Sequence, residues 1–185
     1  MNYFEVFGLP ELLGVDAPAL EKKFHELSRT YHPDYFTTAP ADEKSRALRM
    51  TALLNDAYRA LRHPLRRAEY LVSLHGFKSD GSKVPQALLM EVFEINEQLE
   101  DIRMSGGSDS QIEDLRRQIE AKREKFDEAL QQATKDWDAL VLNSAAESER
   151  KLHLAKLAQL LSESAYIRNL EDEIEGRQGH YKKSG

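Results

Sequence analysis

The chain has 185 residues, of which 41% are hydrophobic and 31% charged, and this composition excludes an intrinsically disordered protein. The absence of cysteine excludes disulfides, cysteine-ligated zinc and iron–sulfur clusters held by thiolates. The net charge of −6 excludes the strongly basic footprint of a typical nucleic-acid-binding protein.

The charge is distributed unevenly along the chain. Residues 1–75 carry 10 Lys/Arg and 10 Asp/Glu, whereas residues 76–185 carry 16 and 22. The start of the sequence, MNYFEVFGLPELLG, lacks the basic and apolar regions of a signal peptide, and no apolar run approaches the ~20 residues that span a bilayer. We therefore expect a cytoplasmic protein with two different surfaces and no membrane or nucleic-acid partner.

Apolar residues at helical spacing predict three helices in the first 75 residues, after a short aromatic segment at 2–8. Asp16 is the expected N-cap of a helix over 17–31, whose apolar stripe is Leu20, Phe24, Leu27 and Tyr31. A second helix is predicted over 41–62, with Leu48, Leu54, Tyr58 and Leu61 on its apolar side. A third is predicted over 64–75, with Gly76 as its C-terminal cap.

The tripeptide His32-Pro33-Asp34 ends the first of these helices, because proline disfavours helical backbone before it. Alone it is ordinary turn chemistry, and without a nearby Ser or Cys nucleophile we expect no catalytic residue here. As a binding element, Pro33 would reduce the entropy lost on docking, and Asp34 offers a carboxylate to a partner arginine. The preceding helix carries Lys22, Lys23 and Arg29, which either attract an acidic partner or form a solvated face.

Two stretches flank the tripeptide: N-Y-F-E-V-F-G-L before it and L-N-D-A-Y-R-A-L-R-H-P-L-R-R-A-E-Y after it. In this order and spacing they resemble the J-domain family of DnaJ-type co-chaperones, with Leu71 as a departure where many J-domains have Asp. The resemblance implies an antiparallel helical hairpin that docks on a DnaK-type chaperone and stimulates its ATP hydrolysis. The chaperone-binding residues that it implies are His32, Pro33, Asp34, Lys22, Lys23 and Arg29.

The turn-rich stretch G-F-K-S-D-G-S-K-V-P at 76–85 predicts a domain boundary. Helical patterns follow at 85–104, 109–142 and 146–175. We therefore expect an all-α protein with an N-terminal J-domain and a C-terminal three-helix bundle. The expected divisions are a J-domain at 1–75, a linker at 76–84, a bundle domain at 85–175 and a flexible tail at 176–185.

The helix predicted over 85–104 has more apolar surface than one stripe needs. Its core stripe is Leu88, Val92, Ile95, Leu99 and Ile102. Leu89, Met90 and Phe93 fall outside that stripe, together with Glu94, Glu97, Glu100 and Asp101. An apolar patch with an acidic rim is typical of a protein-binding surface. The alternative is a wider stripe, in which Leu89 and Phe93 pack against a third helix.

The remaining two helices carry partners for the stripe. One helix offers Ile112, Leu115, Ile119, Phe126, Ala133 and Leu140, with Lys122 interrupting, and the other offers Leu157, Leu160, Ile167 and Ile174. Tyr166 either flanks the exposed patch or lies at the edge of the core.

Three segments extend the resemblance to nearly the whole chain: R-H-P-L-R-R-A-E-Y-L-V-S-L-H-G-F at 62–77, L-L-M-E-V-F-E-I-N-E-Q-L at 88–99 and Y-I-R-N-L-E-D-E-I at 166–174. They resemble the HscB family, the co-chaperones of iron–sulfur cluster assembly, and the lack of cysteine resembles its bacterial form. The resemblance implies an adaptor, not an enzyme, that binds the scaffold IscU and delivers it to the DnaK-type chaperone HscA. The scaffold-binding residues that it implies are Leu89, Met90, Phe93, Glu94, Glu97, Asp101 and Tyr166.

Two alternatives stay open. The first is a J-domain adaptor that recruits a different client protein to a DnaK-type chaperone. The second is a His/carboxylate metalloprotein, for which His25 and Glu21 share a helix face, whereas His153 is isolated and the sequence has no H-E-x-x-H or similar ligand set. We expect no metal and no cofactor.

Overall fold

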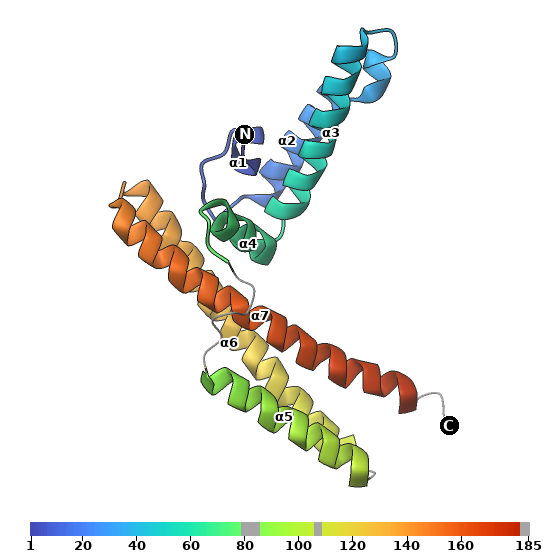
Figure 1. Cartoon of the computed structure of the whole chain (residues 1–185), viewed down its shortest axis with the longest axis vertical. Helices are drawn as coiled ribbons and strands as arrows, with labels where there is room; N and C mark the ends of the chain where they lie inside the picture. The colour runs from blue at the N-terminus through green and yellow to red at the C-terminus, as the bar shows by residue number, and fades with distance from the viewer. Residues whose placement is uncertain (79–85, 106–108, 182–185) are drawn as a thin grey trace. The chain divides into compact units, whose positions relative to one another are not determined.

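The structure is a computed structural model that describes residues 1–78, 86–105 and 109–181 (Figure 1). Every regular element in these ranges is a helix, which confirms the all-α fold class. The chain divides into two compact units, the first made of Met1–Phe77 with Ala133–Leu154, and the second of Lys78–Gln132 with Ala155–Gly185. Most of the expected linker, 76–84, lies outside the described residues.

The first unit contains α1 (Tyr3–Val6), α2 (Ala17–Thr30), η1 (Pro33–Phe36), α3 (Ala41–Leu61) and α4 (Pro64–Leu74). The expected start and stop signals are confirmed. The Asp16 carboxylate caps α2 by accepting the Ala19 N–H at 3.0 Å. Gly76, with φ of 78°, follows the end of α4 in the left-handed conformation that favours glycine.

Helices α2 and α3 pack through a stack of Phe24 on Tyr58, whose ring centroids are 4.3 Å apart. The buried residues of α3 are Ala47, Leu54, Ala57 and Leu61. The expectation that Leu48 belongs to this apolar side is wrong, because its side chain is 58% exposed. Leu48 lies about 100° or more around the helix from each of these four buried residues, so it is outside the face of α3 that meets the core.

The first unit also includes one end of the long hairpin formed by α6 (Asp109–Leu142) and α7 (Glu147–Tyr181). Trp137 of α6 is buried, and its indole N–H donates to the Glu11 carbonyl at 2.7 Å. The Asp138 carboxylate accepts the backbone N–H groups of Leu13 at 2.6 Å and Gly14 at 2.7 Å. These three bonds fix the loop between α1 and α2.

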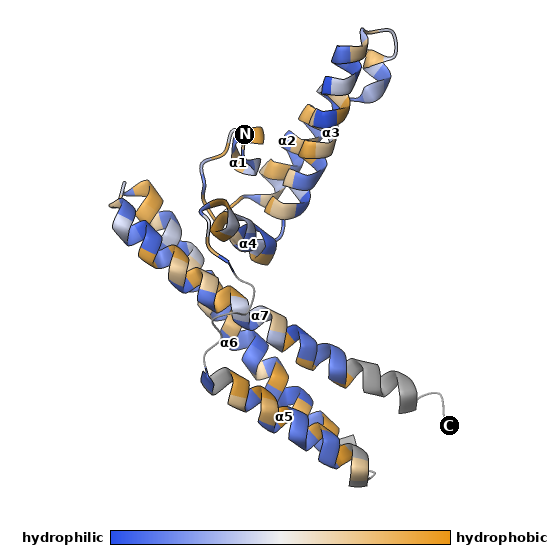
Figure 2. Cartoon of the chain, in the orientation of Figure 1, coloured by the Kyte–Doolittle hydropathy of each residue, from blue (hydrophilic) through white to orange (hydrophobic). Residues whose placement is uncertain are grey.

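In the second unit, α5 (Gln86–Ser105) packs against α6 and α7. Apolar and polar residues are interspersed along all three helices (Figure 2). The core consists of Ile95, Leu99, Leu115, Ile119, Leu170 and Ile174, with Val92 and Ile102 packed against it. This confirms the predicted stripe on α5, except that the side chain of Leu88 lies outside the described residues. Helix α7 runs to Tyr181, past its expected end at 175 and into the expected flexible tail; the side chains after Ile174 are not among those described.

Candidate functional site

The His-Pro-Asp loop, residues 32–34, is tied to the helices on both sides of it. Its segment continues as the 3-10 helix η1, and the Nδ1 atom of His32 accepts the Asp34 N–H at 3.3 Å. At the base of the loop, the Thr51 hydroxyl of α3 donates to the Tyr31 carbonyl at 2.9 Å. The loop is thus held in place from inside, while the Asp34 side chain is 82% exposed.

The Asp34 carboxylate lies 3.6 Å from the Nδ1 atom of His32. Within the described ranges no lysine or arginine pairs with this carboxylate, which leaves it available to a cation on a partner.

The three predicted basic residues have different surroundings. Arg29 lines an open pocket of about 320 Å³ beside the His-Pro-Asp loop, together with His25, Ser28, His32, Asp34 and Tyr35. Lys22 is exposed two turns earlier on the same face of α2. The ammonium group of Lys23 instead donates to the Phe7 carbonyl, so Lys23 braces α2 against the end of α1.

The α5 patch, which we define as Leu89, Met90 and Phe93, is exposed. The exposed fractions of these side chains are 45%, 58% and 68% in that order, whereas Ile95 and Leu99 on the same helix are buried. This exposure argues against the wider core stripe. The predicted acidic residues of the rim, Glu94, Glu97 and Asp101, are exposed as well. Burying the apolar side chains of the α5 patch against a partner is favourable by about 25 cal/mol per Å² of apolar surface.

Tyr166 of α7 is half-buried, which fits the core-edge position and leaves part of the ring accessible. Its membership in the scaffold-binding set stays a prediction.

A polar cluster joins the three helices of the second unit. Lys122, the residue that interrupts the apolar repeat of α6, pairs with Glu91 of α5. Burial raises the pKa of Glu163 on α7, Glu91 raises it further, and Lys122 opposes the shift. Arg123, the next residue of α6, donates two hydrogen bonds to the Glu171 carboxylate of α7, and these bonds raise the pKa of Arg123. These pairs fix the register of α5 and α7 on α6.

Sequence reasoning missed the contacts of Trp137 and Asp138. A signal for the tryptophan was present, because Trp137 continues the repeat of Ala133 and Leu140 on α6. No local pattern marks Asp138, whose backbone partners, Leu13 and Gly14, lie more than a hundred residues earlier in the chain.

Across the described residues, no group of three or more His, Cys, Asp or Glu side chains is placed to hold a metal ion. No helix in these ranges combines the length and the apolar character needed to cross a membrane.

Comparison with known proteins places this arrangement among co-chaperones. The family model described as the HSCB C-terminal oligomerisation domain matches residues 84–175. The solved structure of chaperone HscB from Vibrio cholerae is 31% identical, with a TM-score of 0.66, and the match covers 98% of this chain and 99% of that one. The crystal structure of the human co-chaperone protein HscB is 24% identical, with a TM-score of 0.69, over 96% of this chain and 82% of that one.

Proposed function

Because this chain belongs to the HscB family of co-chaperones, we propose that it binds an IscU-type iron–sulfur scaffold and delivers it to a DnaK-type chaperone of the HscA kind. Delivery stimulates the ATPase of the chaperone during iron–sulfur cluster biogenesis. The protein is an adaptor in this scheme, and the chaperone carries out the hydrolysis. The cluster belongs to the scaffold as cargo.

The observation that carries the scaffold half of the proposal is the exposure of the α5 patch. Phe93 is 68% exposed on a helix whose opposite face supplies Ile95 and Leu99 to the core. Three neighbouring apolar side chains in water favour a partner that covers them. The exposed carboxylates of Glu94, Glu97 and Asp101 add a preference for a basic rim on that partner.

The His-Pro-Asp loop supports the chaperone half. Its backbone is held by His32 and Thr51, so the Asp34 carboxylate is presented without a large ordering cost on docking. Arg29 lies beside it and Lys22 on the same face of α2, which favours an acidic partner surface with an arginine opposite Asp34.

Carrying both sites on one chain raises the effective concentration of the scaffold near the chaperone. The test is the ATPase rate of a DnaK-type chaperone with this protein alone, with an IscU-type scaffold alone, and with both. We expect stimulation by both together to exceed the product of the separate effects. A combined stimulation equal to the product of the two separate effects would contradict the adaptor scheme.

The second candidate is a J-domain adaptor for a different client, and the same observation, an exposed apolar patch, supports it. Titration of the α5 patch with the scaffold and with an unfolded polypeptide distinguishes the two. Binding of the unfolded polypeptide, but not of the scaffold, would favour the second candidate.

A further inference from the structure

We propose that a groove between the α1–α2 loop and α2 receives an apolar side chain of the DnaK-type chaperone, presented next to a carboxylate. This inference rests on the proposed function, because it names a second contact for the same partner. The groove, which we call the loop groove, has a volume of about 400 Å³. Its apolar lining is Leu9, Pro10, Leu12, Val15, Ala19 and Leu20.

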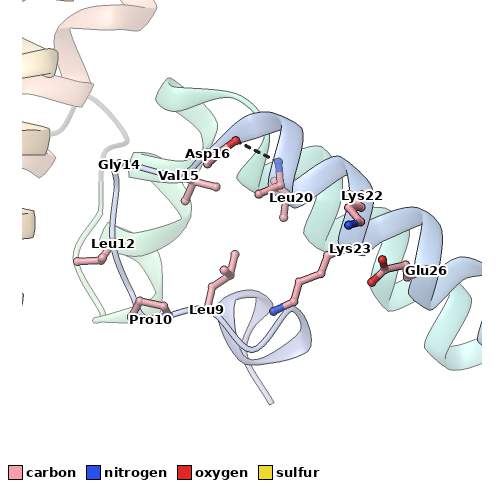
Figure 3. A pocket seen from close by; sticks show the side chains of 11 residues that line it. Leu9, Pro10, Leu12, Gly14, Val15, Asp16, Leu20, Lys22, Lys23 and Glu26 are labelled. Atoms are coloured by element: carbon pink, nitrogen blue, oxygen red, sulfur yellow. Dashed lines mark hydrogen bonds between the residues drawn. The ribbon is translucent and has the colours of Figure 1, made fainter.

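The loop groove has an apolar floor and walls from two elements. Leu20, on the core side of α2, is 2% exposed and forms part of the floor. Figure 3 shows Leu9 and Val15 pointing from the loop into the space in front of α2. An aliphatic side chain that entered here would bury apolar surface against the floor and the loop wall, which is the main source of affinity in such sites.

The wall formed by the loop cannot collapse to fill the space. Its first residue, Leu9, donates its N–H to the Phe4 carbonyl at 2.9 Å, and its last part is held by Asp138 through Gly14. The side chain of Lys23 extends from α2 toward α1 (Figure 3), and its ammonium group donates to the Phe7 carbonyl at one end of the groove. The groove is therefore preformed, so an occupant pays little for ordering it.

Charge at the rim indicates what accompanies the apolar side chain. Asp16 is engaged in capping α2, and the Lys23 ammonium is engaged with Phe7. Among the described residues, no carboxylate forms an ion pair with the remaining rim cation, Lys22. Glu26, one turn further along α2, disfavours a second acidic group there. The matching ligand is one aliphatic side chain with one carboxylate next to it.

The position of the groove on α2 points to the chaperone as the owner of that ligand. Lys22 lines the loop groove, and Arg29 lines the pocket beside the His-Pro-Asp loop. They are seven positions apart on the helix, which is about 10 Å along the axis and about 20° around it. A single partner surface can therefore reach the two sites at once.

The test fills the groove in the full-length protein. Ala19→Phe places a ring in the groove without touching a side-chain hydrogen bond, because Ala19 contributes only its backbone N–H to the cap. We expect the concentration for half-maximal ATPase stimulation to rise about tenfold, with the maximal stimulation unchanged. The matched control is Ala17→Phe, an exposed residue of the same helix turn that does not line the groove.

Equal titration curves for Ala19→Phe and Ala17→Phe would overturn the inference. Loss of stimulation by Asp34→Asn in the same assay shows that the chaperone half of the proposed function holds, so a failure of the groove is distinguishable from a failure of chaperone docking. If Ala19→Phe lowers the helical content, a photo-crosslinking residue at 19, compared with one at 17, replaces it. Crosslinks to the chaperone from 19 and not from 17 support the contact, and the reverse result or equal yields contradict it.

Discussion

The His-Pro-Asp loop and the α5 patch present binding groups in opposite ways. The loop offers one exposed carboxylate, Asp34, on backbone that His32 and Thr51 hold in place. The α5 patch offers three apolar side chains on a regular helix, where no special backbone is needed. The first site therefore depends on geometry, whereas the second depends on buried area. A single conservative change should abolish the first, and only combined truncations should strongly weaken the second.

The largest effect is expected from Asp34→Asn. The substitution keeps the shape of the side chain and removes its charge, so a charge-assisted bond to the chaperone is lost. We expect ATPase stimulation to fall to the basal level at all concentrations, with an unchanged circular dichroism spectrum because Asp34 is 82% exposed. Normal stimulation by this variant would show that the loop is only a helix stop. Asp56→Asn, an exposed aspartate on α3, serves as the control.

The α5 patch should respond in a graded manner. Alanine at Leu89, Met90 and Phe93 together is expected to weaken scaffold binding by about 100-fold, and each single change by a smaller factor. The free energy of unfolding should fall by much less than the ~2–5 kcal/mol per site that is typical of core truncation. Calorimetric titration and chemical denaturation measure the two quantities.

A matched control for the patch is Leu152→Ala, which truncates a leucine of α7 that is 60% exposed. It should change neither scaffold binding nor stability appreciably. Unfolding of the triple variant would mean that the patch residues are part of the core, which would remove the distinction between the two sites.

Most of the fold could be predicted from the sequence, because helical periodicity and capping are encoded locally. The stripe of Ile95 and Leu99 followed from helical periodicity, and the capping by Asp16 from local chemistry. Leu48 was misplaced because it lies about 100° or more around α3 from the residues that are buried, and which face of a helix is buried depends on the neighbours packed against it. The bonds from Asp138 to Leu13 and Gly14 could not be anticipated, since no local pattern encodes a contact over such a separation.

The loop that forms the wall of the groove offers a third, smaller effect. Asp138→Ala leaves the N–H groups of Leu13 and Gly14 without their acceptor, and we expect a loss of about 1–3 kcal/mol in the free energy of unfolding. Glu128→Ala, an exposed acidic residue of the same helix, should change the stability by about 0.5 kcal/mol or less.

Gly14 sharpens this test. A Cβ atom on Gly14 would lie 2.6 Å from the Asp138 Oδ2 atom, so Gly14→Ala should destabilise the native protein. In the Asp138→Ala background the obstacle is gone, and the same substitution should cost less. A double-mutant cycle by chemical denaturation measures this coupling, and strictly additive effects would show that the carboxylate does not set the position of the loop.

The smallest effect concerns Glu163 of α7, which interacts with the charges of Glu91 and Lys122. Burial and the charge of Glu91 raise its pKa above the ordinary value of 4.5, so the folded protein binds this proton more tightly than the unfolded chain does. Its contribution to stability is therefore present below pH 4.5 and is lost as the pH rises through the raised value. At neutral pH, Glu163→Gln should stabilise the protein by about 0.5 kcal/mol or less and flatten this part of the pH dependence. Thermal unfolding between pH 4 and 8, compared with Glu128→Gln, measures the difference. A loss of stability at neutral pH would mean that the attraction of Lys122 outweighs the burial and the repulsion by Glu91. In that case the surface of α5, like the His-Pro-Asp loop, would depend on a specific charge for its position.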